Sequence, residues 1–144
     1  MATKRSGIVK GYASMWPREV FDAKGAGGRV LATQIDFLTK EKGVYVLYRE
    51  EFPHYIGKSK VSLFERLKGH AMNPRMRYYN FWTHFSAFAV PDKKGRDELE
   101  GILIAAMPTA NGAKPKFGAK ERLPKPVGSL MKKLRQARVE AALR

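Results

Sequence analysis

The sequence contains no cysteine among its 144 residues. A disulfide framework, a thiolate zinc site and a cysteine nucleophile are therefore excluded. It also lacks any apolar run of the roughly 18–20 residues that a membrane-spanning helix needs. The basic N-terminus is not followed by the apolar segment of a secretory signal. Together these absences predict a cytoplasmic protein without a membrane partner, and association with the nucleoid is compatible with that location.

Acidic residues are scarce relative to basic ones. Thirteen Asp and Glu residues face 28 Lys and Arg residues, which leaves a formal net charge of +15. Such an excess favours polyanionic partners, with nucleic acid ahead of an anionic membrane surface. Charge alone indicates neither catalysis nor a choice between DNA and RNA, so the evidence for chemistry has to come from motifs.

The chain divides into three regions by composition. We expect an N-terminal extension at residues 1–40, a dense central domain at 41–111 and a basic tail at 112–144. The tail carries +8 of the net charge, and its proline- and glycine-rich part, 112–128, is expected to be extended. From Ser129 onward, leucine and alanine recur at helical spacing, which predicts a basic helix.

Alternating periodicities predict the fold class of the central domain. Residues 43–48 and 54–57 are rich in β-branched and aromatic side chains and predict a hairpin, and residues 82–90 predict a third strand. Ser62, followed by Glu65, is a capping-box pattern that predicts a helix. A second helix is expected at 97–107, ended by Pro108. The expectation is an α/β (α+β) domain with a small three-stranded, mainly antiparallel sheet flanked by helices.

Several polar residues fall where a phosphodiester nuclease would need them. Tyr45 and Tyr55 lie on paired strands, so their side chains are expected side by side. Arg66 and His70 are four residues apart and share a helix face, expected to lie away from the apolar stripe of that helix. Each of these residues alone is more often packing or surface charge than a functional group. Their combination carries the hypothesis.

These residues sit in motifs that resemble the GIY-YIG nuclease family. Gly43-Val44-Tyr45 and Tyr55-Ile56-Gly57 resemble the two halves of the signature, with valine in place of isoleucine. The segment 66–70 is similar to the arginine helix, 99–104 to the helix that carries the metal glutamate, and Pro108 with Asn111 to the closing motif. The resemblance covers residues 43–111, about half the chain, and implies the β-β-α-β-α core of that family.

The resemblance implies a catalytic set of Tyr45, Tyr55, Arg66, His70, Glu100 and Asn111. Glu100 would bind one Mg²⁺ or Mn²⁺ ion, since a carboxylate oxygen is a hard ligand for a hard cation. Tyr45 would deprotonate or orient the attacking water, and its pKa of about 10 would need lowering by positive charge. Glu98 is the competing carboxylate on the same helix.

The remaining implied roles concern the phosphate. Arg66 would bind the scissile group bidentately, and Tyr55 would steer the water or the phosphate. His70 would assist proton transfer or contact phosphate, or else be an ordinary polar surface residue. Asn111 would fix the core near the site through backbone hydrogen bonds.

Basic side chains outside this set are the candidates for nucleic-acid binding. A stretch with Tyr78, Tyr79, Phe81 and Trp82 mixes basic and aromatic residues, which either stack on bases or anchor a loop. The expected activity is endonucleolytic hydrolysis of DNA, double-stranded or branched. A binding module without cleavage and an RNA-directed nuclease stay open, as does the oligomeric state. The candidate contacts are Lys58, Lys68, Arg75, Arg77, Lys114, Lys116, Lys132, Lys133 and Arg135.

Overall fold

The computed structural model describes residues 7–76, 78–112, 114–117 and 121–144. At its centre, β2 (Gly43–Arg49) and β3 (Phe52–Lys58) form the predicted hairpin, and β2 also pairs with β4 (His84–Ala89). All pairings are antiparallel, and the two residues between β2 and β3 close a tight turn in which Glu50 has a φ of +53°. The α+β class is confirmed.

The sheet has one strand more than the three that we expected. β1 (Gly11–Pro17) lies at the outer side of β4, so the strand order is β1-β4-β2-β3. Residues 1–40 are therefore not simply an extension, since part of this region completes the sheet. An irregularity between Ala13 and Trp16 interrupts the alternation of β1, and Met15 there has a φ of +53°. This disrupted periodicity explains why the strand escaped prediction.

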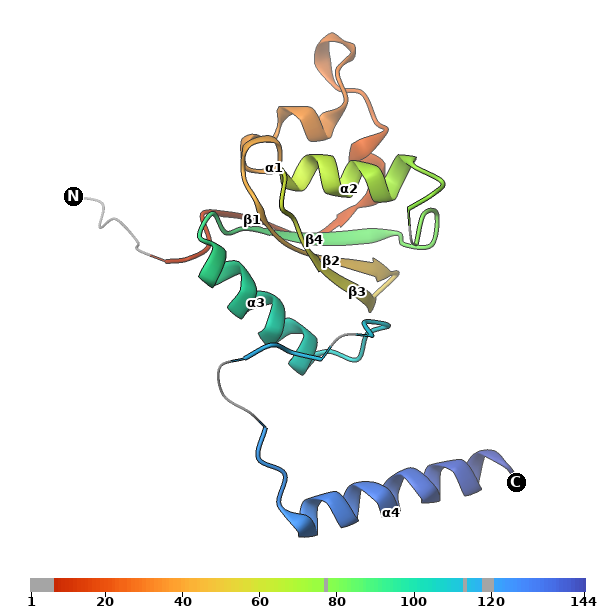
Figure 1. Cartoon of the computed structure of the whole chain (residues 1–144). Coiled ribbons are helices and arrows are strands. Elements are labelled where there is room, and N and C mark those ends of the chain that lie inside the picture. The colour runs from red at the N-terminus through yellow and green to blue at the C-terminus, as the bar shows by residue number, and fades with distance from the viewer. Residues whose placement is uncertain (1–6, 77, 113, 118–120) are drawn as a thin grey trace, which may run out of the picture.

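Helices cover both faces of the sheet (Figure 1). α1 (Asp36–Lys40) and α2 (Leu63–Met72) lie on one face, and α3 (Lys93–Ala106) lies on the other. The alternation of β2 accounts for the two layers, because Tyr45 and Leu47 belong to the core under α2, whereas Val44 and Val46 pack with the apolar side chains of α3. Short 3-10 helices at Arg18–Phe21, Ala26–Gly28 and Leu31–Gln34 lead into α1.

Local capping sets where the helices begin and end. Ser62 accepts a hydrogen bond from the Glu65 backbone N–H at 3.2 Å, so the predicted cap of α2 is confirmed. α3 starts four residues before the expected Asp97, because the Asp92 side chain caps it by accepting from Gly95 N–H. It ends before Pro108, as expected.

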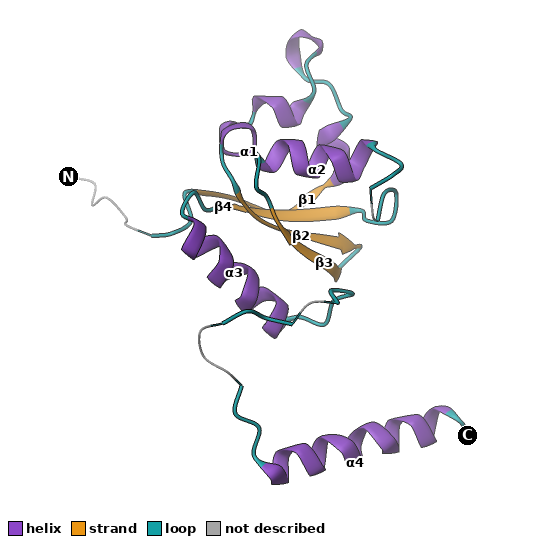
Figure 2. Cartoon of the chain, in the orientation of Figure 1, coloured by secondary structure: helices purple, strands orange, loops and turns teal. Residues whose placement is uncertain are grey.

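The basic tail holds a long helix, α4 (Lys125–Ala142), which begins earlier than Ser129 (Figure 2). Pro126 lies in its first turn, where proline is tolerated because the missing N–H would have had no helical partner. No residue of α4 is buried, and Figure 1 shows it apart from the sheet layers. Among the described residues, no helix is long and apolar enough to cross a membrane.

Candidate active site at the edge of the sheet

Tyr45 is the centre of the site on the α2 face. Its ring crosses toward Gly57, its partner on β3, and a Cβ at Gly57 would overlap the phenol. The absence of a side chain at Gly57 therefore lets the Tyr45 hydroxyl lie against the edge strand. The glycine of the second motif has a packing reason in this structure.

Two side chains of α2 hydrogen bond to the Tyr45 hydroxyl. His70 Nε2 lies 2.9 Å from it, and Arg66 donates to it through Nε at 3.3 Å. Because a guanidinium can only donate, the hydroxyl accepts from Arg66, and its own hydrogen can go to His70 when Nε2 carries no proton. The interaction of Arg66 with Tyr55 also raises the pKa of Arg66.

The burial of this network corrects two expectations. His70 is only 2% exposed and lies on the buried stripe with Leu63 and Leu67, so the face that it shares with Arg66 does not point away from them. A side chain this buried, behind Tyr45, cannot reach a phosphate in this arrangement. His70 Nε2 contacts the Tyr45 hydroxyl instead.

Burial also decides the protonation of Tyr45, which is 0% exposed. Desolvation raises the pKa of Tyr45 to about 12, and the hydrogen bond from Arg66 offsets only part of this effect. Arg66 lowers the pKa of Tyr45 as expected, but burial outweighs its effect, so the expected net lowering does not occur. At neutral pH the phenol of Tyr45 therefore keeps its proton in the free protein.

Tyr55 lies next to this network and is half-buried. Its ring centroid is 6.3 Å from that of Tyr45, 6.0 Å from that of His70 and 5.1 Å from that of Tyr78. The two motif tyrosines are therefore side by side, as the hairpin predicted. Together with Arg66, they form one contiguous group drawn from β2, β3 and α2.

Glu100 lies on α3, across the edge strand from the tyrosines. Its carboxylate is 3.8 Å from the ammonium of Lys58, and Asp97, one turn earlier, is 2.7 Å from the same ammonium. Burial raises the pKa of Glu100, Lys58 lowers it and Asp97 raises it. Glu98, the competing carboxylate, is exposed on the helix. Sequence reasoning missed Asp97, although its i, i+3 spacing to Glu100 was a visible signal.

The tyrosine network and the carboxylates of α3 lie on opposite faces of the sheet and approach each other around the edge strand β3. α2 and α3 lie on opposite faces of the sheet (Figure 1), yet Glu100 is one of the charges that raise the pKa of Tyr45. The carboxylate and the phenol are thus in electrostatic range. The candidate residues therefore wrap the edge of the sheet and do not all lie on one face of it.

The carboxylates of α3 are the groups that suit a divalent ion. Within the described residues, no cluster of three or more His, Asp or Glu side chains could hold a metal. Mg²⁺ needs only one or two carboxylates when water and phosphate fill its remaining positions. The ammonium of Lys58 between Asp97 and Glu100 shows that this place favours a cation, so the donor set fits one hard ion.

Asn111 joins the site from the segment after α3. Its side-chain oxygen accepts from the Ile56 N–H at 2.9 Å, and its amide nitrogen donates to the Ile56 carbonyl at 2.7 Å. Both groups belong to the backbone of β3, so Asn111 makes the backbone hydrogen bonds expected of it. Asn111 thereby fixes the position of β3, the edge strand that lies between the motif tyrosines and Glu100.

The candidate nucleic-acid contacts are scattered over the surface. Lys58 is held by the carboxylates of α3, and Lys68 lies over the ring of Phe64. In the basic-aromatic stretch, Trp82 is a core residue at 2% exposure, so it does not stack on bases. Arg77 lies outside the described residues. Exposed side chains among the others are Arg75, Lys114, Lys116, Lys132, Lys133 and Arg135.

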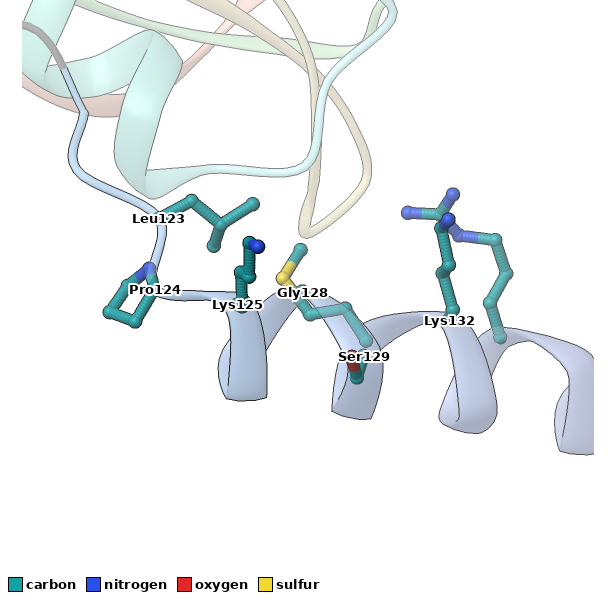
Figure 3. Close-up of a pocket in the computed structure, with 8 residues that line it drawn as sticks. Leu123, Pro124, Lys125, Gly128, Ser129 and Lys132 are labelled. Atoms are coloured by element: carbon teal, nitrogen blue, oxygen red, sulfur yellow. The ribbon is translucent and has the colours of Figure 1, made fainter.

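The tail helix presents its basic residues beside apolar ones. A groove of about 510 Å³ runs along its first turns, and Lys132 and Arg135 line it together with Leu123 and Met131 (Figure 3). All four side chains are exposed. This surface is separate from the tyrosine network, so it could raise the affinity for a ligand but would take no part in chemistry at that network.

No protein-family model, curated protein or solved structure matches the chain. The resemblance to GIY-YIG nucleases stays a prediction from the sequence motifs.

Proposed function

We propose that the protein is a metal-dependent endonuclease that hydrolyses DNA phosphodiester bonds in the manner of GIY-YIG nucleases. One observation carries the proposal: Tyr45, Tyr55, Arg66 and His70 form a single hydrogen-bonded and ring-packed group at the sheet edge that Glu100 approaches from the other face.

Arg66 is the residue that would bind the scissile phosphate. It is exposed, and its Nε is engaged by Tyr45, so the guanidinium is held at the mouth of the buried network. A guanidinium matches two phosphate oxygens at once and stabilises the charge that develops on them. Tyr55, half-buried beside it, would orient the phosphate or the attacking water.

Tyr45 and His70 would manage the proton of the attacking water. With its pKa near 12, Tyr45 would accept a water proton only as it passes its own to His70. The 2.9 Å contact between the Tyr45 hydroxyl and Nε2 provides that path. His70 is a positioning and relay residue in this scheme and makes no contact with substrate.

Glu100, with Asp97 beside it, would hold one Mg²⁺ or Mn²⁺ ion. Such an ion supplies Lewis acidity to a phosphoryl oxygen and charge for the leaving oxygen. Lys58 would have to move aside or share the carboxylates with the ion, since its ammonium now lies between them.

Two other functions compete with DNA cleavage. The same fold could bind nucleic acid without cutting it, and the charge of +15 is equally suited to RNA. In the binding alternative the Arg66–Tyr45–His70 network would have a structural role only, since a satisfied polar network rigidifies a core. The RNA alternative is tested by comparing cleavage of RNA substrates with cleavage of DNA substrates.

A nicking assay separates these functions. We expect the wild-type protein to relax supercoiled plasmid with Mg²⁺ or Mn²⁺, and Glu100→Gln and Arg66→Ala to lower the rate by at least about 100-fold. Glu98→Gln is the matched control, because it removes an exposed carboxylate from the same helix and should keep the activity. A panel of plain, nicked, flapped and branched DNA, with RNA counterparts, identifies the substrate. No cleavage on any member with either metal would refute the proposal.

A further inference from the structure

A β-bulge in β3 turns His54 toward the face of the tyrosines. Leu47 pairs with Tyr55 and Tyr48 pairs with Pro53, so His54 is the extra residue in the ladder. Neighbouring residues of a regular strand point to opposite faces. Here the His54 ring lies 4.6 Å from the Tyr78 ring and the Tyr55 ring lies 5.1 Å from it, so both face the same aromatic partner. Bulges that redirect a side chain are common beside functional sites.

His54 belongs to an aromatic cluster at the hairpin end of the sheet. Phe81 lies 4.2 Å from His54, measured between ring centroids, and the Arg49 guanidinium lies 4.7 Å from the Phe81 ring. Arg49 also donates to the Phe81 carbonyl, which ties the hairpin to the loop between α2 and β4 (Figure 1). Burial and Arg49 lower the pKa of His54, so its ring stays neutral at physiological pH.

A groove of about 310 Å³ opens onto this cluster. It is lined by Arg49, Glu50, Phe52, Pro53, His54 and Phe81. Its size is at the lower end for small-molecule sites and suits a single planar ring system. Phe52 is 78% exposed at the rim, so its ring offers a free aromatic face.

The lining of the groove holds one cation, Arg49, and one carboxylate, Glu50. Glu50 in the lining and Glu51 in the same turn repel phosphate, in a protein that is otherwise strongly basic. A carboxylate can accept hydrogen bonds from exocyclic amino groups of bases, and Arg49 adds a cation for stacking. Aromatic and arginine faces together are typical of sites that stack single-stranded bases.

We propose that this groove binds one unpaired nucleobase, stacked on Phe52 and on the His54–Phe81 pair. His54 directly precedes Tyr55, so the base would belong to a nucleotide close to the phosphate that Arg66 binds. The inference rests on the proposed function in taking the ligand to be DNA and in placing the base near the phosphate that Arg66 binds. It assigns to the protein a preference for DNA with an unpaired or displaced base near the cleavage position.

Binding without any divalent ion tests the groove separately from cleavage. The probe is a duplex with one unpaired 2-aminopurine, compared with the same duplex fully paired, in the presence of a chelator. We expect the wild-type protein to prefer the unpaired duplex and to quench the 2-aminopurine fluorescence. Phe52→Ala should weaken binding to the unpaired duplex about fivefold or more, leaving the paired duplex unaffected. Phe52→Trp should restore both the preference and the quenching.

Tyr12→Ala is the matched control, because Tyr12 is a 65% exposed aromatic residue on β1, at the opposite edge of the sheet. It should change neither affinity. Equal weakening of both duplexes by Phe52→Ala, or an unchanged preference, would overturn the inference. The nicking assay distinguishes the two proposals: a protein that keeps the base preference but never cleaves refutes the nuclease alone. One that cleaves but shows no Phe52-dependent preference refutes the stacking site alone.

Discussion

The Tyr45→Phe variant is the most direct probe of the buried network. The substitution keeps the ring and removes a hydroxyl that is bonded to His70 at 2.9 Å and to Arg66 at 3.3 Å. Loss of a buried hydrogen-bonding group costs about 1–3 kcal/mol. We therefore expect the free energy of unfolding at pH 8 to fall by about that amount.

The pH dependence of this difference follows from the pKa of Tyr45. A native pKa of about 12 lies above the ordinary value of 10.0, so the unfolded state releases this proton first as the pH rises. The stabilisation is complete below pH 10 and is lost progressively between pH 10 and pH 12. Two units of pKa correspond to about 3 kcal/mol in total, of which about 1 kcal/mol is lost by pH 11. Tyr45→Phe has no such proton to lose.

Urea unfolding of both proteins between pH 8 and pH 11.5 measures the effect. The stability advantage of the wild type should shrink steadily above pH 10. Tyr12→Phe, with the hydroxyl removed from an exposed ring, is the control and should stay within about 0.5 kcal/mol of the wild type at pH 8. A wild-type advantage over Tyr45→Phe that is constant across this range would refute the argument that desolvation controls Tyr45.

Three further outcomes are expected. Asn111→Ala removes two hydrogen bonds from Ile56 and should lower the free energy of unfolding by about 1–3 kcal/mol. The Ile56 amide should also exchange its hydrogen faster, and an unchanged exchange rate would contradict this prediction. Deleting residues 121–144 removes α4, none of which is buried, so the urea midpoint of unfolding should not change. The salt dependence of DNA affinity should become weaker, and an unaltered salt dependence would mean that α4 does not contact phosphate. Lys58→Met removes the cation beside Glu100 and should tighten Mn²⁺ binding roughly two- to fivefold by calorimetry; weaker binding would show that Lys58 supports the ion.

The elements that the sequence predicted well are those with local signals. The Ser62 cap and the proline after α3 act within one helical turn, and the hairpin of β2 and β3 follows from two β-branched and aromatic runs joined by a short turn. β1 has no comparable signal. It is a strand because β4 offers it a partner more than sixty residues away, which no local pattern contains.

The same distinction separates the parts of the site. The proximity of Tyr45 and Tyr55 follows from the hairpin, in which Tyr45 pairs with Gly57 and Tyr55 pairs with Leu47, and sequence spacing was enough to predict it. The pKa of Tyr45 depends instead on how completely three elements exclude water, which is a sum over distant contacts. The position of His54 was equally hidden, because a bulge inverts the alternation on which strand predictions depend.

The segment after α3 has a consequence for self-association. Besides the two Asn111 bonds, Ala110 N–H donates to the His54 carbonyl, so the outward-facing peptide groups in the middle of β3 are already occupied. An uncovered edge strand invites the edge of another copy to extend the sheet, which is a common start of aggregation. Ala110 and Asn111 thus block this edge as a neighbouring strand would, and the groove at the hairpin end stays open.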